Sequence, residues 1–435
     1  MKKIILLFIL FSGKLAFSQQ VLSLEEVIKR TLEKNFDVLI QRNNLKIADN
    51  TNNIGTAGYL PTIAITADQT WTTTNTRQEF YSGQVNEKTG ANNNSLNASA
   101  RLNWTFFDGF AMFARDKRLQ LTEDLATVNL TAQMEMSIYQ ASVLYYSLQY
   151  YKRLQIVYEE AIQLSKERFD LIALRSKNGA ASDLELLQAK LDLNTDSSNY
   201  LNHLNIISKM KADLAMVMGE AGEISFDVDD NIPALPALDK SIILENALSQ
   251  NTSLLVQKSQ IAIIDQQRKE IQSRYYPQLS FYANYSAAVS QSEVGLLSSN
   301  RSIGPGIGFT LSWTILDGLA NVTAVKNNRF QKENAEFAVQ KQEQTIKTEV
   351  DKAWQDYTYS ERMYRLENSS VVNTTAMFEI AQKSFENGSL TQFELREIQF
   401  SIIQAKNRQL SSEFNLRTAV LNVGLFTGDY KKLIP

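Results

Sequence analysis

The side chains most often used for catalysis and metal binding are scarce in this chain. His203 is the only histidine among 435 residues, and cysteine is absent. Zinc sites built from cysteine and histidine are therefore excluded, as are cysteine nucleophiles. His203 lies in the middle of a helical pattern, where a structural role is expected. Carboxylates are numerous, yet no pair is singled out for acid–base work, so we expect no enzyme, no cofactor and no metal site.

One glycine-rich segment, Gly304-Pro-Gly-Ile-Gly308, has the composition of a phosphate-binding loop. No helix start and no Gly-Lys-Ser/Thr follows it, so a nucleotide site is not expected. The formal net charge is −3, and basic and acidic residues are interspersed along the chain. Binding to nucleic acid needs a basic face, so no nucleic-acid partner is expected.

The N-terminus predicts a secreted protein. Lys2 and Lys3 precede a short apolar run, Ile4 to Phe11, and Ala16-Phe17-Ser18 resembles a cleavage site. We interpret residues 1–18 as a signal peptide. A membrane anchor is the alternative, but the run is much shorter than the ~20 residues of a spanning helix. No later stretch approaches ~18 uninterrupted apolar residues, so a transmembrane helix is not expected.

The remaining chain contains two copies of one unit. Asn35 and Pro61 correspond to Asn251 and Pro277, each 216 positions later. An offset of 209 relates three further pairs: Leu102–Gly109 with Leu311–Gly318, Asn178-Gly179 with Asn387-Gly388, and Gly219 with Gly428. The offsets differ by 7, which is one insertion between Pro61 and Trp104. We therefore divide the chain into a first repeat at 19–220, a linker at 221–239 and a second repeat at 240–435.

Each repeat is predicted to begin with an amphipathic helix, about Leu24 to Gly58 and Lys240 to Tyr276. Pro61 and Pro277 follow these helices, and proline is tolerated at the first residue of a strand. Two strands and a polar loop come next. The loops are expected at about Thr72 to Ser95 and Ala288 to Ser302.

The expected strands alternate between apolar and polar residues. In Leu96 to Phe106 and in Ile307 to Ile315, every second residue is apolar, and the strands that begin at Thr62 and Gln278 alternate in the same way. A period of two over about ten residues is typical of a membrane strand, apolar toward lipid and polar toward the lumen. A half-buried sheet in a soluble sandwich is the alternative.

Very long helices are predicted after the strands. Asp108-Gly109 and Asp317-Gly318 close the strands, because aspartate caps a helix and glycine permits a sharp turn. Two stretches of 69 residues, Phe110 to Asn178 and Leu319 to Asn387, then lack glycine and proline. A helix of this size is ~100 Å long and requires coiled-coil packing. Gly179 and Gly388 turn the chain into return helices of about 35 residues that end near Gly219 and Gly428.

Four strands cannot close a barrel, because both sheet edges would be open in lipid. Known barrels begin at eight strands, and three copies of this chain would supply twelve. The helices would then form a second, coaxial tube. A soluble periplasmic coiled-coil adaptor or scaffold is the alternative function. It accounts for the helices and the signal peptide, but not for the strands or the repeat.

The ordered set of features resembles the TolC family of outer-membrane efflux proteins. It comprises the duplicated unit, the Phe-Asp-Gly and Leu-Asp-Gly turns, the 69-residue helices, and the tips Asn178-Gly-Ala-Ala-Ser-Asp-Leu-Glu-Leu186 and Asn387-Gly-Ser-Leu-Thr-Gln-Phe-Glu-Leu395. The resemblance implies a membrane α+β fold. In it, a homotrimer forms a 12-stranded β-barrel continued by a long antiparallel α-helical barrel, with a mixed belt that includes Ile224 to Val228 and the C-terminal segment.

The resemblance also implies a function and partners. The chain would be the passive outer-membrane exit channel of a tripartite efflux or type I secretion system. It would contact outer-membrane lipid, a periplasmic adaptor (membrane fusion protein) and an inner-membrane pump of the RND or ABC type. The cargo is not indicated.

In the family, acidic residues six and nine positions after the second-repeat glycine form carboxylate rings at the periplasmic gate. Here these are Glu394 and Glu397, glutamates instead of the usual aspartates, and Glu185 is the first-repeat equivalent of Glu394. Crowded like charges raise one another's pKa and favour cations. Phe385 and Leu390 stand where the family's gate has tyrosine and arginine, so closure is expected to depend on apolar contact.

Two further groups of residues complete the expected sites. The adaptor would dock on the tips, whose candidate residues are Asn178, Gly179, Ser182, Asn387, Gly388 and Thr391; ordinary hairpin-turn chemistry is the alternative. Trp71, Trp104 and Trp313 are expected at strand ends as interface anchors, with core packing as the alternative. Arg101 is expected on the lumen face.

Overall fold

The structure is a computed structural model that describes residues 20–220, 226–230, 235–236 and 238–428. The predicted signal peptide, Ile224 and most of the expected C-terminal segment lie outside the described residues. The chain divides into two compact units. The helical unit comprises the described parts of Met1–Arg42, Leu130–Leu254 and Glu343–Pro435, and the sheet unit comprises Asn43–Asn129 and Leu255–Gln342. Each unit therefore takes segments from both repeats.

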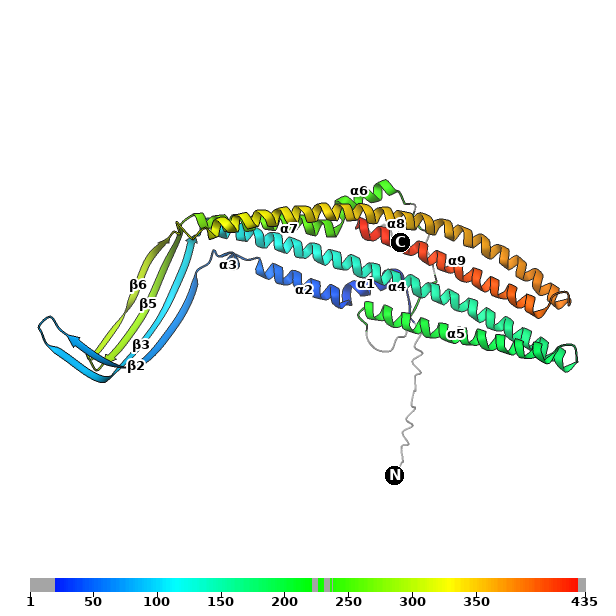
Figure 1. The fold of residues 1–435 in the computed structure, drawn as a ribbon, viewed down its shortest axis with the longest axis horizontal. Coiled ribbons are helices and arrows are strands. Elements are labelled where there is room, and N and C mark those ends of the chain that lie inside the picture. The colour runs from blue at the N-terminus through cyan, green and yellow to red at the C-terminus, as the bar shows by residue number, and fades with distance from the viewer. Residues whose placement is uncertain (1–19, 221–225, 231–234, 237, 429–435) are drawn as a thin grey trace, which may run out of the picture. The chain divides into compact units, whose positions relative to one another are not determined.

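The sheet unit contains one antiparallel sheet of four strands, as the alternation predicts. The strands are β2 (Thr62–Glu79), β3 (Val85–Phe107), β5 (Gln278–Ser292) and β6 (Ser299–Ser312). Their order in the sheet is β2-β3-β5-β6, and Figure 1 shows them side by side. Within the described chain, β2 and β6 each pair on one side only, so the sheet has two open edges.

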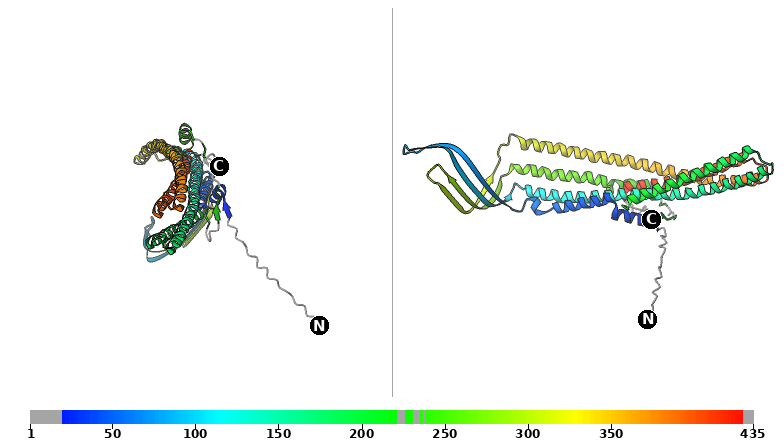
Figure 2. Two further views of the ribbon diagram at one scale, coloured as in Figure 1. Left: turned by 90° about the vertical axis from the view of Figure 1, so that its right-hand side faces the viewer. Right: turned by 90° about the horizontal axis from the view of Figure 1, so that it is seen from below.

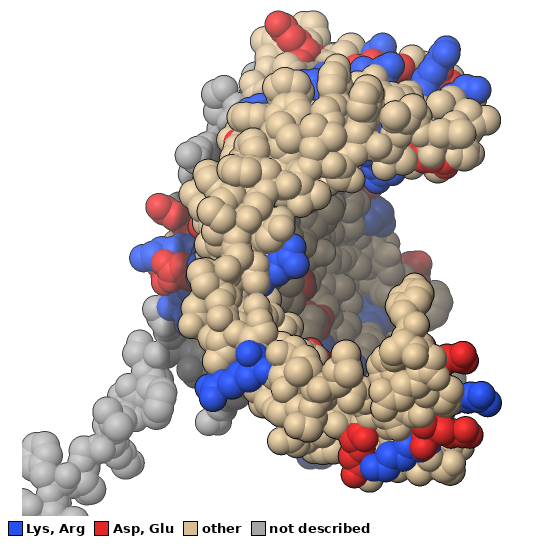
Figure 3. Space-filling model, turned by 90° about the vertical axis from the view of Figure 1, so that its left-hand side faces the viewer, with Lys and Arg blue, Asp and Glu red and all other residues tan. Residues whose placement is uncertain are grey.

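The two faces of this sheet differ completely in chemistry. Register pairs such as Ile63–Leu102, Trp104–Phe281 and Phe281–Phe309 bring the apolar positions of all four strands to one face. This apolar face is solvent-exposed, with Ile65 at 81% and Ile307 at 77%. The end-on view in Figure 3 shows a large surface with few charged side chains. The apolar face consists of Ile63, Ile65, Ala67, Leu96, Ala98, Ala100, Leu102, Trp104, Phe106, Leu279, Phe281, Ala283, Tyr285, Ala287, Val289, Ile303, Pro305, Ile307, Phe309 and Leu311.

The glycine-rich segment at 304–308 lies in β6, on the polar face. A Cβ atom at Gly308 would come within 2.6 Å of the Tyr282 hydroxyl, and one at Gly306 within 2.7 Å of Asn284 Oδ1. The glycines therefore let the neighbouring side chains of β5 lie across the strand. Within one chain, Pro305 lies on the outermost strand of the sheet and faces Tyr285 of β5. Arg101 also lies on the polar face, with its guanidinium 4.8 Å from the centre of the Tyr282 ring.

Both predicted loops, Thr72 to Ser95 and Ala288 to Ser302, are wrong, because most of each is paired strand. Only residues 80–84 separate β2 from β3, and only 293–298 separate β5 from β6. Polar side chains bond across the strands here; Thr73 Oγ1, for example, donates to Asn92 Oδ1 at 2.9 Å. Apolar and polar residues alternate along a strand only where its two faces lie in different environments. Where both faces meet water, the contrast disappears although the strand continues.

The seven-residue insertion lies at the end of the first hairpin. In the second hairpin the outermost register pair is Gln291–Ser299. The two repeat offsets place Asn75 and Gly90 at the equivalent positions, and the Gly90 N–H donates to Asn75 Oδ1 at 2.8 Å. Residues 76–89 lie between this pair, where the second hairpin has only 292–298. The inserted residues thus extend the hairpin beyond the register that the repeats share.

The two long helices and their return helices are present as expected. α4 (Ala111–Lys177) and α8 (Ala320–Glu386) have 67 residues each, and α5 (Asp183–Val217) and α9 (Gln392–Thr427) have 35 and 36. Each long helix forms a hairpin with its return helix in the helical unit (Figure 2). None of the helices in the described residues is both long and apolar enough to cross a membrane.

The first helix of each repeat is broken, which corrects the prediction of one continuous helix. The first repeat has α1 (Leu24–Lys34), α2 (Phe36–Thr51) and α3 (Ile54–Ala57). The second has α6 (Lys240–Gln250), α7 (Thr252–Gln272) and the 3-10 turn η1 (Ser273–Tyr275). One break in each repeat falls at Asn35 or Asn251, the pair that marks the repeat.

These two asparagines interrupt the helix by capping the next one. Asn35 Oδ1 accepts from the N–H groups of Asp37 and Val38, at 3.0 and 3.2 Å. Its Nδ2 donates to the Val217 carbonyl at 2.8 Å. Asn251 repeats the arrangement, because Oδ1 accepts from Leu254 N–H at 3.1 Å and Nδ2 donates to the Phe426 carbonyl at 3.3 Å. Each asparagine therefore ties its helix to the end of a return helix.

The core of the helical unit surrounds a short parallel strand pair, β1 (Gln20–Leu22) and β4 (Phe226–Val228). Leu22, Leu148 and Leu214 are fully buried there, and they come from β1, α4 and α5. β4 is the described part of the belt segment expected at Ile224 to Val228.

Candidate functional site: the tips of the helical hairpins

The two hairpin tips have the same backbone. Gly179 and Gly388 both have φ = +73°, a conformation that favours glycine, and a Cβ atom on either would meet nothing within 4 Å. Glycine is thus required here by the backbone and not by crowding. The six candidate docking residues are all exposed: Asn178, Gly179, Ser182, Asn387, Gly388 and Thr391.

Both return helices begin with a capping box. Ser182 Oγ accepts from Glu185 N–H at 3.3 Å, and the Glu185 carboxylate accepts from Ser182 N–H at 2.7 Å. Thr391 and Glu394 are arranged identically, at 3.3 and 2.9 Å. These hydrogen bonds lower the pKa of Glu185 and of Glu394. The direction is opposite to that expected for crowded carboxylates, because each side chain folds back onto its own helix.

Glu397 lies one turn beyond Glu394 and is free of such engagement. Its side chain is exposed, and it forms no ion pair with any residue that the structure describes. Of the two carboxylates expected in the ring, Glu397 is therefore the one available to a pore.

An apolar cluster joins the two hairpins just above the tips. Phe385 is 5% exposed and packs with Ile172 and Leu395, which come from α4 and α9. Leu390 is a partly buried member of the same cluster. The Arg175 guanidinium lies 5.2 Å from the centre of the Phe385 ring. Phe385 and Leu390 thus pack in an apolar cluster within one chain, and their part in gate closure stays a prediction.

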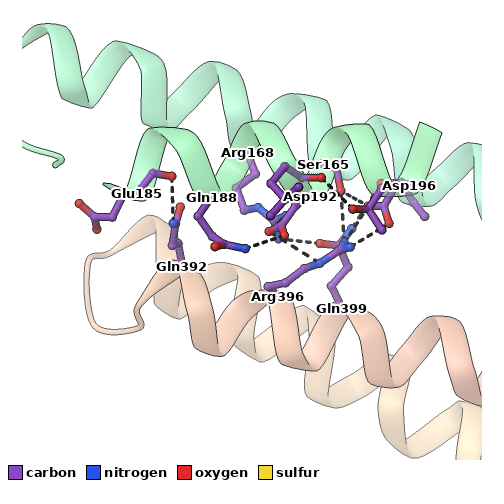
Figure 4. Close-up of polar contacts among 12 residues, drawn as sticks. Ser165, Arg168, Glu185, Gln188, Asp192, Asp196, Gln392, Arg396 and Gln399 are labelled. Carbon is purple, nitrogen blue, oxygen red and sulfur yellow. Dashed lines mark hydrogen bonds and ion pairs between the residues drawn. The ribbon is translucent and has the colours of Figure 1, made fainter. Parts of the chain in front are cut away.

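A buried ionic network crosses the helices above this cluster (Figure 4). Arg396 of α9 grips Asp196 of α5 with both terminal nitrogens, at 2.7 and 2.8 Å. Arg168 of α4 pairs with Asp192 of α5 at 2.8 Å and donates to Gln399 of α9 at 2.9 Å. Ser165 donates to Asp196 and completes the carboxylate's partners.

The network is desolvated, with side-chain exposures of 3% for Arg168, 7% for Asp196, 14% for Asp192 and 19% for Arg396. Burial lowers the pKa of Arg168. Burial also acts against the charge on Arg396, but the hydrogen bonds and attraction of Asp196 and the attraction of Asp192 together outweigh it, and the pKa of Arg396 is raised. A buried charge that loses its partner is strongly destabilising. Separating the two hairpins at this network would therefore cost much free energy.

Sequence reasoning missed these four charged residues, although the repeat contains a signal for them. The offset of 209 places Met377 opposite Arg168, and Leu187 opposite Arg396. Charged residues that replace apolar ones within a repeated helix pattern point to a specific interaction. The same comparison identifies a second missed pair, Leu184 and Phe393, which are equivalent and 76% and 74% exposed beside the tips.

The turns between strands and helices lie where the sequence places them. Pro61 and Pro277 directly precede β2 and β5. Asp108 accepts from Met112 N–H at 3.0 Å, and Asp317 from Asn321 N–H at 2.8 Å. Gly109 and Gly318 have φ of +70° and +65°, and the residues after them, Phe110 and Leu319, are also left-handed.

The three candidate interface tryptophans are exposed, at 73% for Trp71, 41% for Trp104 and 54% for Trp313. Core packing within the chain is therefore not their role. Trp104 and Trp313 lie at the helix end of the sheet and donate to the Tyr59 and Tyr275 carbonyls, at 2.9 and 3.2 Å. Trp71 does not lie at a strand end, because β2 continues to Glu79. It lies at the other limit of the apolar face.

An exposed apolar sheet face joined to long antiparallel helices defines the class of outer-membrane channel subunits. The family model described as outer membrane efflux protein matches residues 27–220 and 243–429. The chain belongs to this outer membrane efflux protein family, whose members are channels of the outer membrane and not enzymes. The resemblance to TolC-like channels is thereby confirmed, and so are outer-membrane localisation and a role in efflux.

Solved structures share the fold at low sequence identity. The Campylobacter jejuni CmeC outer membrane channel is 15% identical, with a TM-score of 0.77 over 93% of this chain and 85% of that chain. The outer membrane protein VceC from Vibrio cholerae is 15% identical, with a TM-score of 0.71 over 93% and 95%. A membrane protein from Pseudomonas aeruginosa is 15% identical, with a TM-score of 0.74 over 93% of both chains. A search of curated protein sequences found no match.

Proposed function

We propose that three copies of this chain close one channel, with a 12-stranded barrel in the outer membrane and a helical tube in the periplasm. The observation that carries the proposal is the four-stranded sheet with an exposed apolar face and two open edges. Open edges are not tolerated in lipid, so other copies must cover them. A soluble periplasmic scaffold, the alternative function, would leave this face in water.

The apolar face has the height of a membrane. Along β3 it extends from Leu96 to Phe106, which corresponds to about 33 Å of strand, or roughly 25 Å for a strand tilted by about 40°. Trp71 lies opposite Asn94 at one limit, and Trp104 and Trp313 lie at the other. Aromatic residues at both limits are the pattern of interface girdles.

The repeat supplies the register between copies. The pairs Thr62–Asn103 and Gln278–Ser312 are related by the two repeat offsets, so both hairpins share one register. Within the chain, β3 pairs with β5 and places Trp104 opposite Phe281. The same offsets applied to this pair place Trp313 opposite Ile65 of a neighbouring copy. Strand β6 of one copy would thus pair edge to edge with β2 of the next. In this register the apolar faces of the two sheets form one continuous surface.

The strand-to-helix turns support the same arrangement. A Cβ atom at Gly109 would lie 2.3 Å from the Ser273 carbonyl, whereas one at Gly318 would meet nothing within 4 Å. Ala57 is the first-repeat equivalent of Ser273. We therefore expect Ala57 of a neighbouring copy to fill the open space beside Gly318.

The tips would receive the periplasmic partner of a tripartite efflux or type I secretion system. Leu184 and Phe393 extend the exposed tip turns with apolar surface, which is the kind of surface that marks protein partners. An adaptor docked there could act on the apolar cluster and on the ionic network that joins the hairpins. An RND or ABC pump in the inner membrane would supply the energy.

Planar-bilayer conductance of the detergent-purified protein tests the channel. We expect cation-selective steps, and we expect Glu397→Gln to reduce this selectivity because it removes the unengaged carboxylate. Glu185→Gln is the matched control, since glutamine preserves a capping box. Steps with unchanged selectivity in Glu397→Gln would refute the carboxylate ring but not the channel. A protein that is soluble and monomeric without detergent would refute the channel itself.

A further inference from the structure

A cavity of about 570 Å³ lies in the sheet unit, between the start of α4 and the end of α7. It combines aromatic and basic side chains, a mixture that neither an apolar core nor a water-filled lumen requires. Its aromatic residues, Phe110, Phe113, Tyr275 and Tyr276, are all about half exposed. The lining is completed by Gly109, Ala114, Lys117, Gln266, Lys269, Gln272 and Ser273.

The lining of the cavity contacts the residues that hold two exposed tryptophans at the helix end of the sheet. The indole N–H groups of Trp104 and Trp313 donate to the carbonyls of Tyr59 and Tyr275. Tyr275 lines the cavity, and Phe113, another lining residue, contacts Tyr59 edge-to-face with ring centres 5.6 Å apart. The cavity is thus continuous with the aromatic girdle at the helix end of the sheet.

In the proposed channel, the lysines of the cavity would lie near the depth of lipid headgroups. Lys117 is six residues into α4, or about 9 Å along the helix axis, and long helical side chains lean toward the helix start. The headgroup layer is roughly 5–8 Å thick on each side of the hydrocarbon. Aromatic side chains at the hydrocarbon boundary with lysine ammonium groups just below match the two parts of a phospholipid.

The charge of these lysines is available to a ligand. Lys117 and Lys269 are exposed, and neither forms an ion pair within the part of the chain that the structure describes. The nearby carboxylate of Glu270 is already engaged by Arg118 at 2.5 Å and lies 3.9 Å from Arg115. Lys117 donates only to the neutral Gln120 side chain, at 3.1 Å.

The assembled channel would leave this cavity uncovered. Gly109 follows β3 and Tyr276 precedes β5, and these are the two central strands of the sheet. Neighbouring copies would pair at β2 and β6. The equivalent junction in the other half of the repeat has Leu319 for Phe110, Val322 for Phe113 and Asn53 for Lys269. The combination of aromatic and basic residues therefore occurs once per chain.

We propose that this cavity binds the phosphate headgroup of a phospholipid in the periplasmic leaflet of the outer membrane. The phosphodiester lies between the ammonium groups of Lys117 and Lys269, and the upper part of the acyl chains packs on Phe110, Phe113 and Tyr276. The inference rests on the proposed function, because it requires the apolar sheet face to be embedded in lipid.

Lipid retention by the detergent-purified protein tests the site. Native mass spectrometry would measure bound phosphatidylglycerol in the wild type, in Lys117→Gln/Lys269→Gln and in Lys326→Gln. Lys326 is the repeat equivalent of Lys117, is exposed and lies outside the cavity. Each basic side chain near an anionic lipid contributes about a five-fold affinity, so the double variant should bind roughly 25-fold more weakly while Lys326→Gln is unchanged.

Equal retention in all three proteins would overturn the proposal. Equal protection against thermal unfolding by inorganic phosphate and by phosphatidylglycerol would also overturn it, since the cavity would then be a site for a free anion. Lys269→Gln alone, with an expected loss of about five-fold, replaces the double variant if the latter does not assemble. Conductance measured on the same samples separates the two proposals, because a conducting protein without lipid preference contradicts only the lipid site.

Discussion

At the scale of single residues, the ionic network near the tips is the feature in which equivalent positions of the two repeats differ most clearly. Arg396 and Asp196 form a two-point contact in a desolvated setting, and α5 and α9 meet through it. The repeat equivalents are Leu187 and Ala405, so the same helical scaffold is also built without these charges.

Removing one partner of this pair should destabilise the hairpins, and removing both should not. Asp196→Ala leaves Arg396 with only the more distant Asp192 carboxylate, at 3.8 Å, and Arg396→Leu leaves the buried Asp196 carboxylate without its cation. We expect each to cost about 3 kcal/mol in denaturant unfolding. The double variant, which has the residues of the other repeat, should recover most of this loss. Arg365→Leu, in an exposed pair with Glu361, is the control and should change little. Additive losses in the double variant would contradict the coupling.

Glu135 provides a second prediction at this scale. Its side chain is 9% exposed and accepts a hydrogen bond from Thr252 Oγ1 at 2.9 Å. Burial raises its pKa above the ordinary value of 4.5. The folded protein therefore favours the neutral form, and the stability that this form gives is lost as pH rises from 4.5 through the raised pKa.

Glu135→Gln should accordingly raise the unfolding temperature at pH 8 by roughly 2–4 °C and leave it unchanged at pH 4. Glutamine retains an acceptor for Thr252 but has no charge to desolvate. Scanning calorimetry at the two pH values measures the effect, with the exposed Glu386→Gln as control. A stabilisation of equal size at both pH values would show that burial of the charge is not its cause.

At single residues, the number of roles open to a residue type decides how much the sequence can predict. Phe385 can only pack, and it packs between the hairpins. A glutamate near a helix start has two uses, and Glu394 caps its helix although its spacing also suits a pore ring. The partners of Arg168 and Arg396 lie 24 and 200 positions away, a distance at which sequence patterns carry no information about contact.

At the scale of elements, Asn35 and Asn251 were recognised as repeat markers, but their effect on the helices was not. An asparagine inside an amphipathic pattern looks like a tolerated polar residue. Asn35 breaks the helix because its side-chain oxygen accepts from a backbone N–H of the next helix, while its side-chain nitrogen donates to the distant Val217 carbonyl. The apolar periodicity continues through the break, since both pieces face the same core.

Replacing either asparagine with alanine should therefore loosen the end of a return helix as well as a helix start. We expect Asn35→Ala and Asn251→Ala each to cost about 1–2 kcal/mol, from a lost cap and an unpaired carbonyl. Hydrogen exchange should show faster exchange at the amides of Asp37 and Val38, and faster exchange near Val217. Asn35→Ser keeps a capping oxygen and should affect only the second region. If Asn35→Ala speeds exchange only at Asp37 and Val38 and not near Val217, the side chain does not hold the end of the return helix.

At the scale of the whole molecule, the repeat turns contacts inside one chain into predictions of contacts between chains. The chain has no cysteine, so introduced pairs can be tested without background. The pair Arg101–Asn284 faces across β3 and β5. Its repeat equivalents are Thr310 and Asp68, which would face each other across β6 of one copy and β2 of the next.

Oxidation of a Thr310→Cys/Asp68→Cys protein should therefore yield covalent oligomers. Facing residues of an antiparallel pair have Cα atoms about 4.5–5.5 Å apart, within the range that a disulfide can bridge, whereas diagonal neighbours are about 7–8 Å apart. Thr310→Cys/Thr70→Cys is the off-register control and should cross-link poorly. Arg101→Cys/Asn284→Cys should close within one chain, without a change in mass on a denaturing gel. Preferential cross-linking of the off-register pair would refute the repeat-derived register.

The inserted hairpin end has a consequence for how this protein can change. Residues 76–89 lie beyond the last register pair that both repeats share. The length of this segment therefore does not affect how the strands pair in the rest of the sheet. The sequence and length of this segment can therefore change in evolution without altering the strands that the proposed assembly requires. In the proposed channel this segment faces the cell exterior, so it is the position at which antigenic variation would be tolerated and at which an epitope tag could be inserted for display.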